Sequence, residues 1–292
     1  MTIDIICPLY NSADSILGLK QSFEKQKNVK LNKIRFVLTE STDSSEQILK
    51  DNKIEYKKIT KEEFSHSTAR EDEAMQSDAD ILVFVTQDVV IEREDWLEKL
   101  VAPIIAGEVD ACFSRQVSKF NNIEKYTREK NYPAESYVNA KEDLETKGMK
   151  AFFFSDASSA IKTETFKKLG GYDGKRLPTN EDMYIAYKLI TNGYKIKYCA
   201  DSVVCHSHKF TLKQVYDRYR LVGRFMAENS YLDQYGTTKA GGGLAKYILK
   251  RALKEFNIKV LFRFFPDMFA RYFGMKKGKK DIKKIQKKGN KR

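Results

Sequence analysis

The first half of the chain alternates between short, almost continuously apolar runs and longer stretches in which apolar residues recur at helical spacing. Short apolar runs bounded by polar residues are typical of buried strands, and the intervening pattern is typical of amphipathic helices. We predict, in chain order, a strand at 2–7, a helix at 13–26, a strand at 34–38, a helix at 67–75 and a strand at 81–85. Apolar strands separated by helices indicate βαβ units and a parallel sheet covered on both faces.

The second half continues the pattern around a polar interruption. Residues 117–150 are rich in Asn, Lys and Glu, which favours a loop-rich, partly helical insertion. We predict helices at 96–105, 163–169, 181–191 and 211–231, and strands at 110–114, 158–161, 195–199 and 202–205. The triplet Gly241–Gly243 then predicts a joint between the α/β part and the C-terminal segment. A hydrophobic fraction of 41% in 292 residues is sufficient for a full core.

The net charge of +13 is concentrated at one end of the chain. Residues 240–292 contain 17 basic and 3 acidic residues, a net +14, so residues 1–239 carry −1. A fold built to bind nucleic acid carries its positive charge on the folded body. This distribution therefore argues against nucleic acid as a partner.

The basic segment combines two patterns. Between residues 244 and 273 apolar and aromatic residues interleave with Lys and Arg, and the last 18 residues hold ten basic and one acidic residue. We expect the last 18 to be poorly ordered. The preceding stretch either packs an apolar helix face on the α/β part or lies in a membrane interface, with the lysines attracted to anionic lipid. An anionic membrane surface is therefore a predicted partner.

Four cysteines stand apart in the sequence, without a CxxC pair. This arrangement favours neither a disulfide framework nor a zinc site, and it is typical of the reducing cytosol. No signal-peptide pattern follows Met1, and no apolar run approaches the 18 residues of a membrane span. We therefore expect a cytoplasmic location.

Ligands of an open α/β sheet lie beyond the carboxyl ends of its strands. The chain contains no GxGxxG after its first strand and no GxxxxGK[ST], so glycine backbone is not arranged to bind a phosphate. Asp88 follows the strand at 81–85, and its carboxylate could hold a divalent cation that would neutralise a phosphate instead. A turn or helix-cap role for Asp88 is the alternative.

Two further groups could carry chemistry. Asn180-Glu181-Asp182 opens a predicted helix, where acidic residues also interact favourably with the helix dipole. His206 and His208 end a predicted strand and, being two residues apart, lie on the same face of it. One of these imidazoles could coordinate a metal while the other packs.

Several segments, in this order, resemble those of family 2 glycosyltransferases with the GT-A fold over roughly residues 1–230. The segments are CPLYNS (7–12), the loop with Glu40 and Asp43, FSHSTARED (64–72), DADILVFVTQDV (78–89), Gly170–Asp173, Asn180–Asp182 and VVCHSH (203–208). With Arg115-Gln116 and Asn131-Tyr132-Pro133, they are most similar to bacterial rhamnosyltransferases of cell-wall and O-antigen polysaccharides.

The resemblance implies an α/β fold with a mixed, mainly parallel sheet and helices on both faces, followed by basic amphipathic helices. Its catalytic domain would span 1–235, with a nucleotide-sugar-binding half at 1–115 and an acceptor-binding half at 116–235. Residues 236–292 would form the basic, membrane-associating extension.

The resemblance also implies roles for individual residues. Donor binding falls to Pro8, Tyr10, Asn11, Glu40, Arg70, Gln87 and Asp88. Acceptor binding falls to Arg115, Gln116 and Asp156. The family's usual Asp-x-Asp is replaced by Gln87-Asp88, so Asp88 alone supplies the metal-binding carboxylate, with His206 or His208 as a further ligand. Asp182 matches the catalytic base, and Glu181 lies beside it.

The implied function is an inverting transfer of L-rhamnose from dTDP-rhamnose to a lipid-linked saccharide in cell-surface polysaccharide synthesis. Mg²⁺ or Mn²⁺ would be the cofactor, and the enzyme would be peripheral on the inner face of the cell membrane. Two alternatives stay open: a different, UDP-linked donor, and a non-catalytic membrane adaptor with the same fold. A sugar-nucleotide pyrophosphorylase is disfavoured because CPLYNS lacks its glycine- and lysine-bearing loop.

Overall fold

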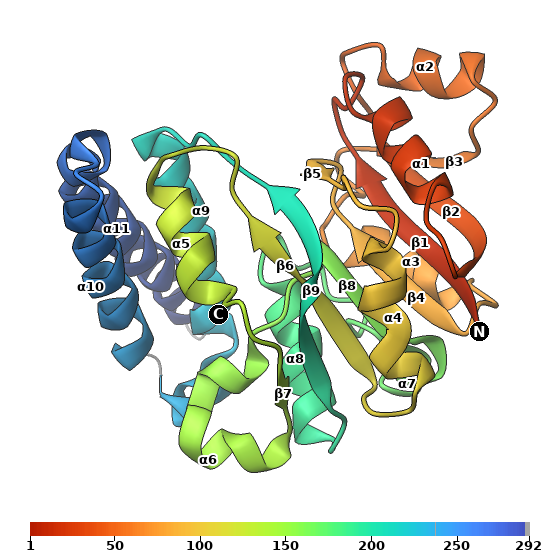
Figure 1. The fold of residues 1–292 in the computed structure, drawn as a ribbon. Helices are drawn as coiled ribbons and strands as arrows, with labels where there is room; N and C mark the ends of the chain where they lie inside the picture. The colour runs from red at the N-terminus through yellow and green to blue at the C-terminus, as the bar shows by residue number, and fades with distance from the viewer. Residues whose placement is uncertain (237, 290–292) are drawn as a thin grey trace. The chain divides into compact units, whose positions relative to one another are not determined.

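A computed structural model describes residues 1–236 and 238–289 of the chain (Figure 1). These residues form two compact units. The first unit comprises residues 1–117, 132–143 and 151–206, and the second comprises 118–131, 144–150 and the chain from 207 onward. The domain boundary predicted after residue 235 therefore falls inside the second unit.

The first unit contains one mixed sheet with the strand order β3-β2-β1-β4-β8-β6-β9-β5, and β7 pairs with β9 off this path. Its strands are β1 (Thr2–Leu9), β2 (Lys30–Thr39), β3 (Tyr56–Ile59), β4 (Ile81–Val85), β5 (Val89–Val90), β6 (Ala111–Val117), β7 (Tyr137–Asn139), β8 (Ser158–Lys162) and β9 (Ile196–His206). Strands β3, β2, β1 and β4 are parallel, and β8 runs antiparallel between β4 and β6. The predicted α/β class with a mixed sheet is confirmed.

Helices of the first unit cover both faces of this sheet (Figure 1). They are α1 (Ile16–Glu24), α2 (Ser45–Asp51), α3 (Thr68–Met75), α4 (Trp96–Ile105), α7 (Thr163–Lys168) and α8 (Glu181–Thr191). The core cluster under α1, α2 and α4 contains the alternate residues Ile3, Ile5, Cys7 and Leu9 of β1, as the two-residue period of a strand requires. On the other face, the ring of Phe84 lies 5.6 Å from that of Phe166 in α7.

The second unit is helical. Its helices are α5 (Ile123–Asn131), α6 (Leu144–Lys147), α9 (Leu212–Glu228), α10 (Thr238–Lys254) and α11 (Ile258–Gly289), with a 3₁₀ turn at Ser230–Tyr235. Helix α9 begins with a capping box, in which Thr211 accepts a hydrogen bond from the backbone N–H of Gln214. Helices α10 and α11 bury Ile248, Ala252, Val260 and Phe264 against Ile123 and Tyr126 of α5.

Glycines let α11 lie directly against α9. A Cβ atom at Gly274 would overlap the carbonyl oxygen of Tyr216, and one at Gly278 would overlap that of Arg220. Further along, Asp281 accepts a hydrogen bond from Arg220 Nε at 2.7 Å, and Ile282 is buried. The predicted disorder of the last 18 residues is therefore wrong as far as Gly289, because packing on α9 stabilises this lysine-rich helix; residues 290–292 lie outside the described part.

Two other expectations are corrected. The joint predicted at Gly241–Gly243 is absent from the described backbone, because α10 runs through these residues. The strands predicted at 195–199 and 202–205 are one strand, β9, whose pairing with β6 shifts register between Ser114 and Arg115. Within the described residues, no helix combines the length and apolar character needed to cross a bilayer.

Candidate active site

The loops that follow β1, β2 and β4 are tied together at one edge of the sheet. Gln87 Oε1 accepts a hydrogen bond from the Tyr10 N–H at 2.5 Å, and Gln87 Nε2 donates to the Tyr10 carbonyl at 2.7 Å. Asn11, in the left-handed region with φ of 45°, accepts from the Thr42 N–H at 2.8 Å. The parallel register of β2, β1 and β4 thus brings together three predicted donor-binding residues, as expected for carboxyl strand ends.

Polar groups at this edge remain available to a ligand. The Tyr10 ring is 42% exposed, Glu40 is exposed, and Pro8 is half-buried near the end of β1. Among the described residues, three hydroxyl groups at or just beyond these strand ends are buried without a hydrogen-bond partner: those of Ser12, Thr39 and Thr86. Buried polar groups normally have partners, so these hydroxyls are consistent with a polar ligand binding here.

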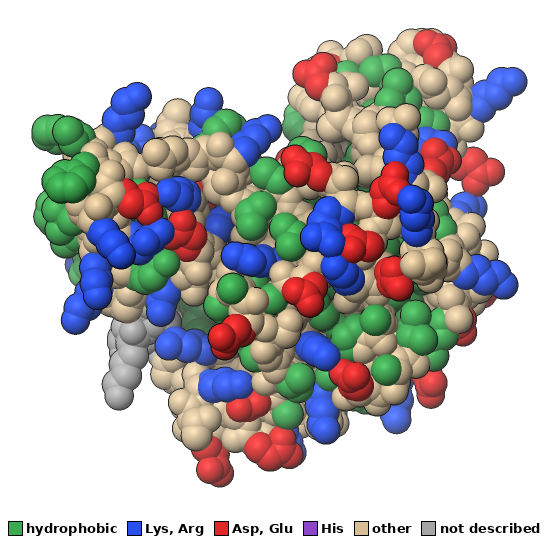
Figure 2. Space-filling view, in the orientation of Figure 1, with side chains coloured by type: hydrophobic (Ala, Val, Ile, Leu, Met, Phe, Trp, Pro, Cys, Tyr) green, Lys and Arg blue, Asp and Glu red, His purple; other side chains and the backbone are tan. Residues whose placement is uncertain are grey.

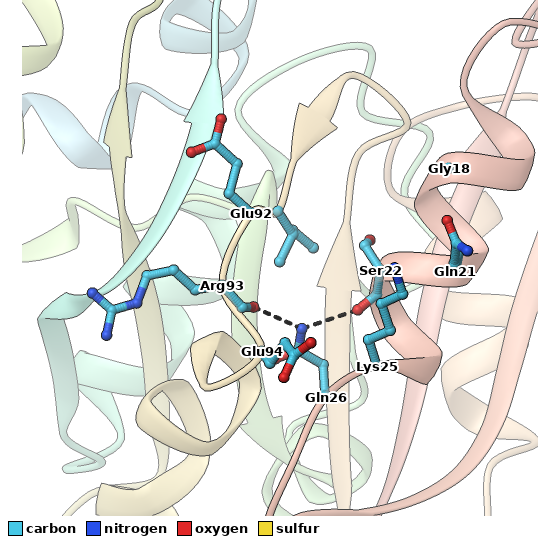
Figure 3. A pocket seen from close by; sticks show the side chains of 9 residues that line it. Gly18, Gln21, Ser22, Lys25, Gln26, Glu92, Arg93 and Glu94 are labelled. Atoms are coloured by element: carbon cyan, nitrogen blue, oxygen red, sulfur yellow. Dashed lines mark hydrogen bonds between the residues drawn. The ribbon is translucent and has the colours of Figure 1, made fainter.

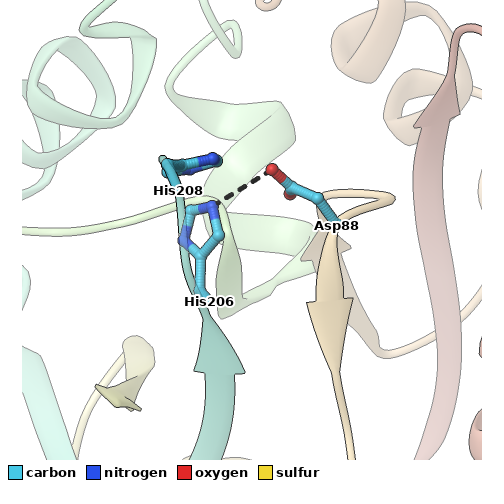
Figure 4. A group of neighbouring side chains, drawn as sticks. All are labelled: Asp88, His206 and His208. Atoms are coloured by element: carbon cyan, nitrogen blue, oxygen red, sulfur yellow. Dashed lines mark ion pairs between the residues drawn. The ribbon is translucent and has the colours of Figure 1, made fainter. Parts of the chain in front are cut away.

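The short strand β5 brings Asp88 to His206 (Figure 4). Strand β5 pairs antiparallel with β9, with Val89 opposite His206. Asp88 Oδ2 then lies 3.4 Å from His206 Nε2, and the two side chains are 42% and 11% exposed, respectively. One ligand atom from each of Asp88, His206 and His208 lies within 4.8 Å of the others, and His208 is only two residues beyond the end of β9.

Gln116 fixes the orientation of the His206 ring. The Oε1 atom of Gln116 lies 2.8 Å from His206 Nδ1, while its Nε2 donates to Ser155 Oγ at 2.8 Å. Because an amide oxygen only accepts, His206 Nδ1 carries a proton, and Nε2 faces the Asp88 carboxylate. With the proton on Nδ1, His206 Nε2 and Asp88 Oδ2 are both acceptors. The two atoms therefore attract each other only through a cation between them or a second proton on the ring.

This donor set fits a divalent metal. Carboxylate oxygen suits Mg²⁺ and Mn²⁺, and imidazole nitrogen suits transition metals. A histidine whose other ring nitrogen donates to a fixed acceptor is the usual arrangement at metal sites. Asp88 and His206, together with His208, are therefore the residues that would hold the ion.

A second group of acids surrounds the start of α8. Asp182 lies in the first turn of α8. The helix begins directly after Asn180, which has a φ of 60°. Its neighbour Glu181 lies 3.4 Å from Nη1 of Arg70, which is 1% exposed and also donates to the His66 carbonyl at 2.7 Å. The buried guanidinium of Arg70 thus lies beside the Glu181 carboxylate. The predicted contact of Arg70 with the nucleotide stays a prediction.

The surroundings of Asp182 and Asp156 favour the protonated forms of these two side chains. Burial raises the pKa of Asp182 well above its usual range, and the nearby charges of Glu181 and Asp156 raise it further. Burial also raises the pKa of Asp156 to about 6. Asp156 is 1% exposed, and its two oxygens accept hydrogen bonds from Ser159 Oγ at 2.8 Å and from the Tyr172 hydroxyl at 2.7 Å.

The predicted acceptor-binding residues differ in exposure. Gln116 and Asp156 are each 1% exposed; Gln116 lies 2.8 Å from the His206 ring, and the charge of Asp156 raises the pKa of Asp182. Arg115 is half-buried, and its Nε atom has no hydrogen-bond partner among the described residues. Of the three residues, Arg115 is the most exposed, although its Nε atom is itself buried.

Glu71 has a positioning contact that the sequence reasoning missed. Its carboxylate accepts hydrogen bonds from the N–H groups of Tyr172 at 2.7 Å and Gly174 at 3.0 Å, so it holds the loop that precedes α8. A Cβ atom at Gly171, where φ is 53°, would lie 2.6 Å from Glu71 Oε1. The glycines at 170, 171 and 174 were a signal for a tight loop, but not for its partner.

A separate hollow of about 220 Å³ lies between the end of α1 and the loop after β5 (Figure 3). Gln26 spans it, donating from Nε2 to the carbonyls of Ser22 and Arg93, each at 2.9 Å. None of the predicted site residues lines this hollow.

Comparison with known proteins extends these observations. The family described as Glycosyl transferase family 2 matches residues 4–170. The O-antigen chain rhamnosyltransferase RfbN of Salmonella typhimurium is 30% identical over 96% of this chain and 90% of its own, and WbaN of Salmonella anatum is 30% identical over 94% and 88%.

Solved structures show the same fold. Staphylococcus aureus TarS 1–349 superposes with a TM-score of 0.56 at 15% identity, covering 97% of this chain and 92% of that one. A mannosyltransferase from Pyrobaculum calidifontis, in complex with GDP-Man and Mn²⁺, gives a TM-score of 0.57 at 14% identity over 93% and 87%.

Proposed function

Because the chain belongs to glycosyl transferase family 2, we propose that it transfers L-rhamnose, with inversion, from dTDP-rhamnose to a lipid-linked saccharide of a cell-surface polysaccharide. The observation that carries this proposal is the 30% identity to an O-antigen chain rhamnosyltransferase along 96% of the chain. The protein is thus a glycosyltransferase, while the donor, the acceptor and its lipid are the proposed part.

Asp182 is proposed as the base that removes the proton from the acceptor hydroxyl. As that hydroxyl attacks C1 of the sugar from the face opposite the nucleotide, its proton passes to the Asp182 carboxylate and the C1–oxygen bond to the diphosphate breaks. Burial raises the pKa of Asp182, and a carboxylate with a raised pKa is a stronger base. Arg70, beside Glu181, offsets the negative charge that the acid group accumulates.

The donor is proposed to bind where the loops after β1, β2 and β4 meet. Tyr10, Asn11 and Glu40 would contact the nucleoside, with the Tyr10 backbone held in place by Gln87. Asp88 and His206, with His208, would hold the metal, and Mn²⁺ is favoured over Mg²⁺ because imidazole contributes. When bound, the ion neutralises charge on the departing diphosphate.

The same comparison supports a proposal for the acceptor and the location. Because the curated relatives are O-antigen chain rhamnosyltransferases, we propose a lipid-linked saccharide as the acceptor, the inner face of the cell membrane as the location, and Arg115 as an acceptor contact. A UDP-linked donor is the alternative, and the binding of UDP-GlcNAc by Staphylococcus aureus TarS, which has the same fold, is the observation that favours it.

A donor panel separates these alternatives. The melting temperature of the full chain would be measured with dTDP-rhamnose, UDP-GlcNAc and GDP-mannose, each with and without Mn²⁺. We expect the largest increase with dTDP-rhamnose plus Mn²⁺, and transfer of rhamnose to a short saccharide acceptor. A larger shift with UDP-GlcNAc, together with transfer of that sugar, would replace the proposed donor.

A further inference from the structure

Helix α11 has two opposite faces with different environments. One face packs against α9 and α10 through Val260, Phe264, Gly274, Gly278 and Ile282, all buried. The other face is exposed and apolar. It carries, with the turn before it, the six residues that we call the aromatic face: Phe256, Phe262, Phe265, Phe269, Tyr272 and Phe273.

The aromatic face is a single stripe of the helix. Phe262, Phe265, Phe269 and Tyr272 are separated by three, four and three residues, so they lie along one side of α11. The exposed fraction of the six residues ranges from 53% at Phe273 to 86% at Phe256. Figure 2 shows hydrophobic side chains gathered over α10 and α11, with Lys and Arg side chains around them. A contiguous exposed apolar patch of this kind marks an interaction surface.

Phe256 combines two local costs. It occupies the turn between α10 and α11 with φ of 51°, in the left-handed region that disfavours residues with a Cβ atom. Its side chain is 86% exposed and so gains little from packing within the unit. Glycine would satisfy this backbone better. An aromatic ring at this position therefore benefits only from contact with something outside the chain.

The charges around the aromatic face select the occupant. The spacing of the stripe continues into lysines at 276, 279 and 283, and Lys276 Nζ lies 5.9 Å from the Tyr272 ring. All three carboxylates of residues 240–292 are engaged in ion pairs: Glu255 with Lys125 at 2.6 Å, Asp267 with Arg271 at 2.5 Å and Asp281 with Arg220 at 2.7 Å. An anionic surface is attracted to this arrangement, whereas a second copy would bring its own net +14 against it.

We propose that the aromatic face is a membrane-inserting surface, which lies in the headgroup region of an anionic bilayer with α11 in the plane of the interface. The six rings enter the boundary between headgroups and acyl chains, and the lysines from 276 onward contact lipid phosphates. The inference deepens the proposed function by naming the surface that reaches the lipid-linked acceptor, but it rests on the second unit alone.

Vesicle binding tests the proposal. The full chain would be sedimented with vesicles of phosphatidylglycerol and phosphatidylcholine, and with phosphatidylcholine alone, in the absence of donor and acceptor. The double variant F262S/F269S removes two exposed rings. As a control, L17S/I105S removes two apolar side chains of the first unit that are about half exposed. We expect at least tenfold weaker binding to the anionic vesicles for F262S/F269S and less than a twofold change for the control.

Three further measurements identify how the surface binds. Phe262→Trp adds a second indole to the buried Trp96, and its emission should shift to shorter wavelength on anionic vesicles. Phe256→Gly should lower vesicle binding while keeping or raising the melting temperature, which separates binding from folding. High salt should weaken the binding of the wild type without abolishing it, because only the lysine contribution is screened.

The outcomes distinguish this surface from the enzymatic function. Equal vesicle binding by wild type and F262S/F269S would overturn the proposal. So would concentration-dependent dimers of the wild type that F262S/F269S abolishes without any change in vesicle binding, since the occupant would then be a second copy. If rhamnose transfer to a soluble acceptor fails while ring-dependent vesicle binding is observed, the proposed function fails and the membrane surface stands.

Discussion

Two carboxylates of the first unit have opposite surroundings. Asp182 lies among Glu181 and Asp156, which raise its pKa, whereas Asp88 faces the His206 ring. Proximity to like charge suits a residue that accepts a proton, and proximity to an imidazole nitrogen suits one that shares a cation. We therefore expect replacement of Asp182 and replacement of Asp88 to change different properties of the protein.

Replacing Asp182, the proposed base, should lower turnover and spare donor binding. Asp182→Asn keeps the shape of the side chain but cannot accept a proton, so kcat should fall by about 10²–10⁴-fold. The donor-induced increase in melting temperature should persist, because Asp182 is not among the predicted donor-binding residues. Steady-state kinetics of sugar transfer measures the first effect, and turnover above a tenth of wild type would remove Asp182 from this role.

Replacing Asp88, the proposed metal ligand, should weaken the binding of Mn²⁺ together with the nucleotide. Asp88→Ala should abolish the additional stabilisation that Mn²⁺ gives to the nucleotide-bound protein in a thermal shift assay. Gln116→Leu should lower the affinity for Mn²⁺ by roughly 10–100-fold, because the His206 ring loses the hydrogen-bond acceptor that orients it. Undiminished Mn²⁺-dependent stabilisation in Asp88→Ala would place the ion elsewhere.

The raised pKa of Asp156 should make the stability of the protein depend on pH. Its pKa is about 6 in the folded protein against 3.8 when free, so its contribution to stability is complete below 3.8 and is lost as the pH rises through 6. Asp156→Asn does not ionise, so its free energy of unfolding relative to wild type should increase by about 2 kcal/mol between pH 4 and pH 8. Urea unfolding at the two pH values measures this, and a constant difference would contradict it.

At the scale of elements, the sequence reasoning succeeded where periodicity was long. Helices 96–105 and 181–191 and strand 81–85 were predicted to the residue, because each has a clear apolar pattern and a sharp boundary. Strand β5 was missed because two residues have no periodicity, and yet it is β5 that brings Asp88 to His206. Asp88, His206, Glu181 and Asp182 were named from their positions at strand and helix ends, and their roles stay predictions. Gln116 was predicted as an acceptor contact and not as the partner of His206, and the contact of Glu71 with the loop before α8 was not predicted.

Glycine residues were poor predictors of where helices break. A glycine can mark a turn, or it can lie inside a helix where a neighbouring backbone packs closely against it. Gly241–Gly243 suggested a break in a region that is helical, whereas Gly278 allows the backbone of α9 to approach. Gly278→Ala should destabilise the second unit by about 2 kcal/mol, because its Cβ atom would meet the Arg220 carbonyl. Gly243→Ala is the matched control: nothing lies within 4 Å of its Cβ position, so it should stabilise α10 by about 0.5–1 kcal/mol. Equal effects of the two variants on the melting temperature would contradict this packing.

At the scale of the whole molecule, the chain divides into an acidic α/β unit with a net charge of −7, which holds the candidate catalytic residues, and a basic helical unit with a net charge of +20. We expect calorimetry of the full chain to show two transitions. Donor nucleotide with Mn²⁺ should raise one of them, that of the first unit, by several degrees, because Asp88, His206 and Asp182 all lie there. A single transition that shifts as a whole would show that the two units unfold together.

The aromatic face has a kinetic consequence. An enzyme held in the plane of a bilayer encounters a lipid-linked acceptor in two dimensions, so its rate depends on the number of acceptor molecules per unit area of membrane and not on their number per unit volume. Adding inert anionic lipid at constant total acceptor would dilute the acceptor on the surface and slow the reaction. The same addition would leave transfer to a water-soluble acceptor at its original rate, since that acceptor reaches the enzyme from bulk solution.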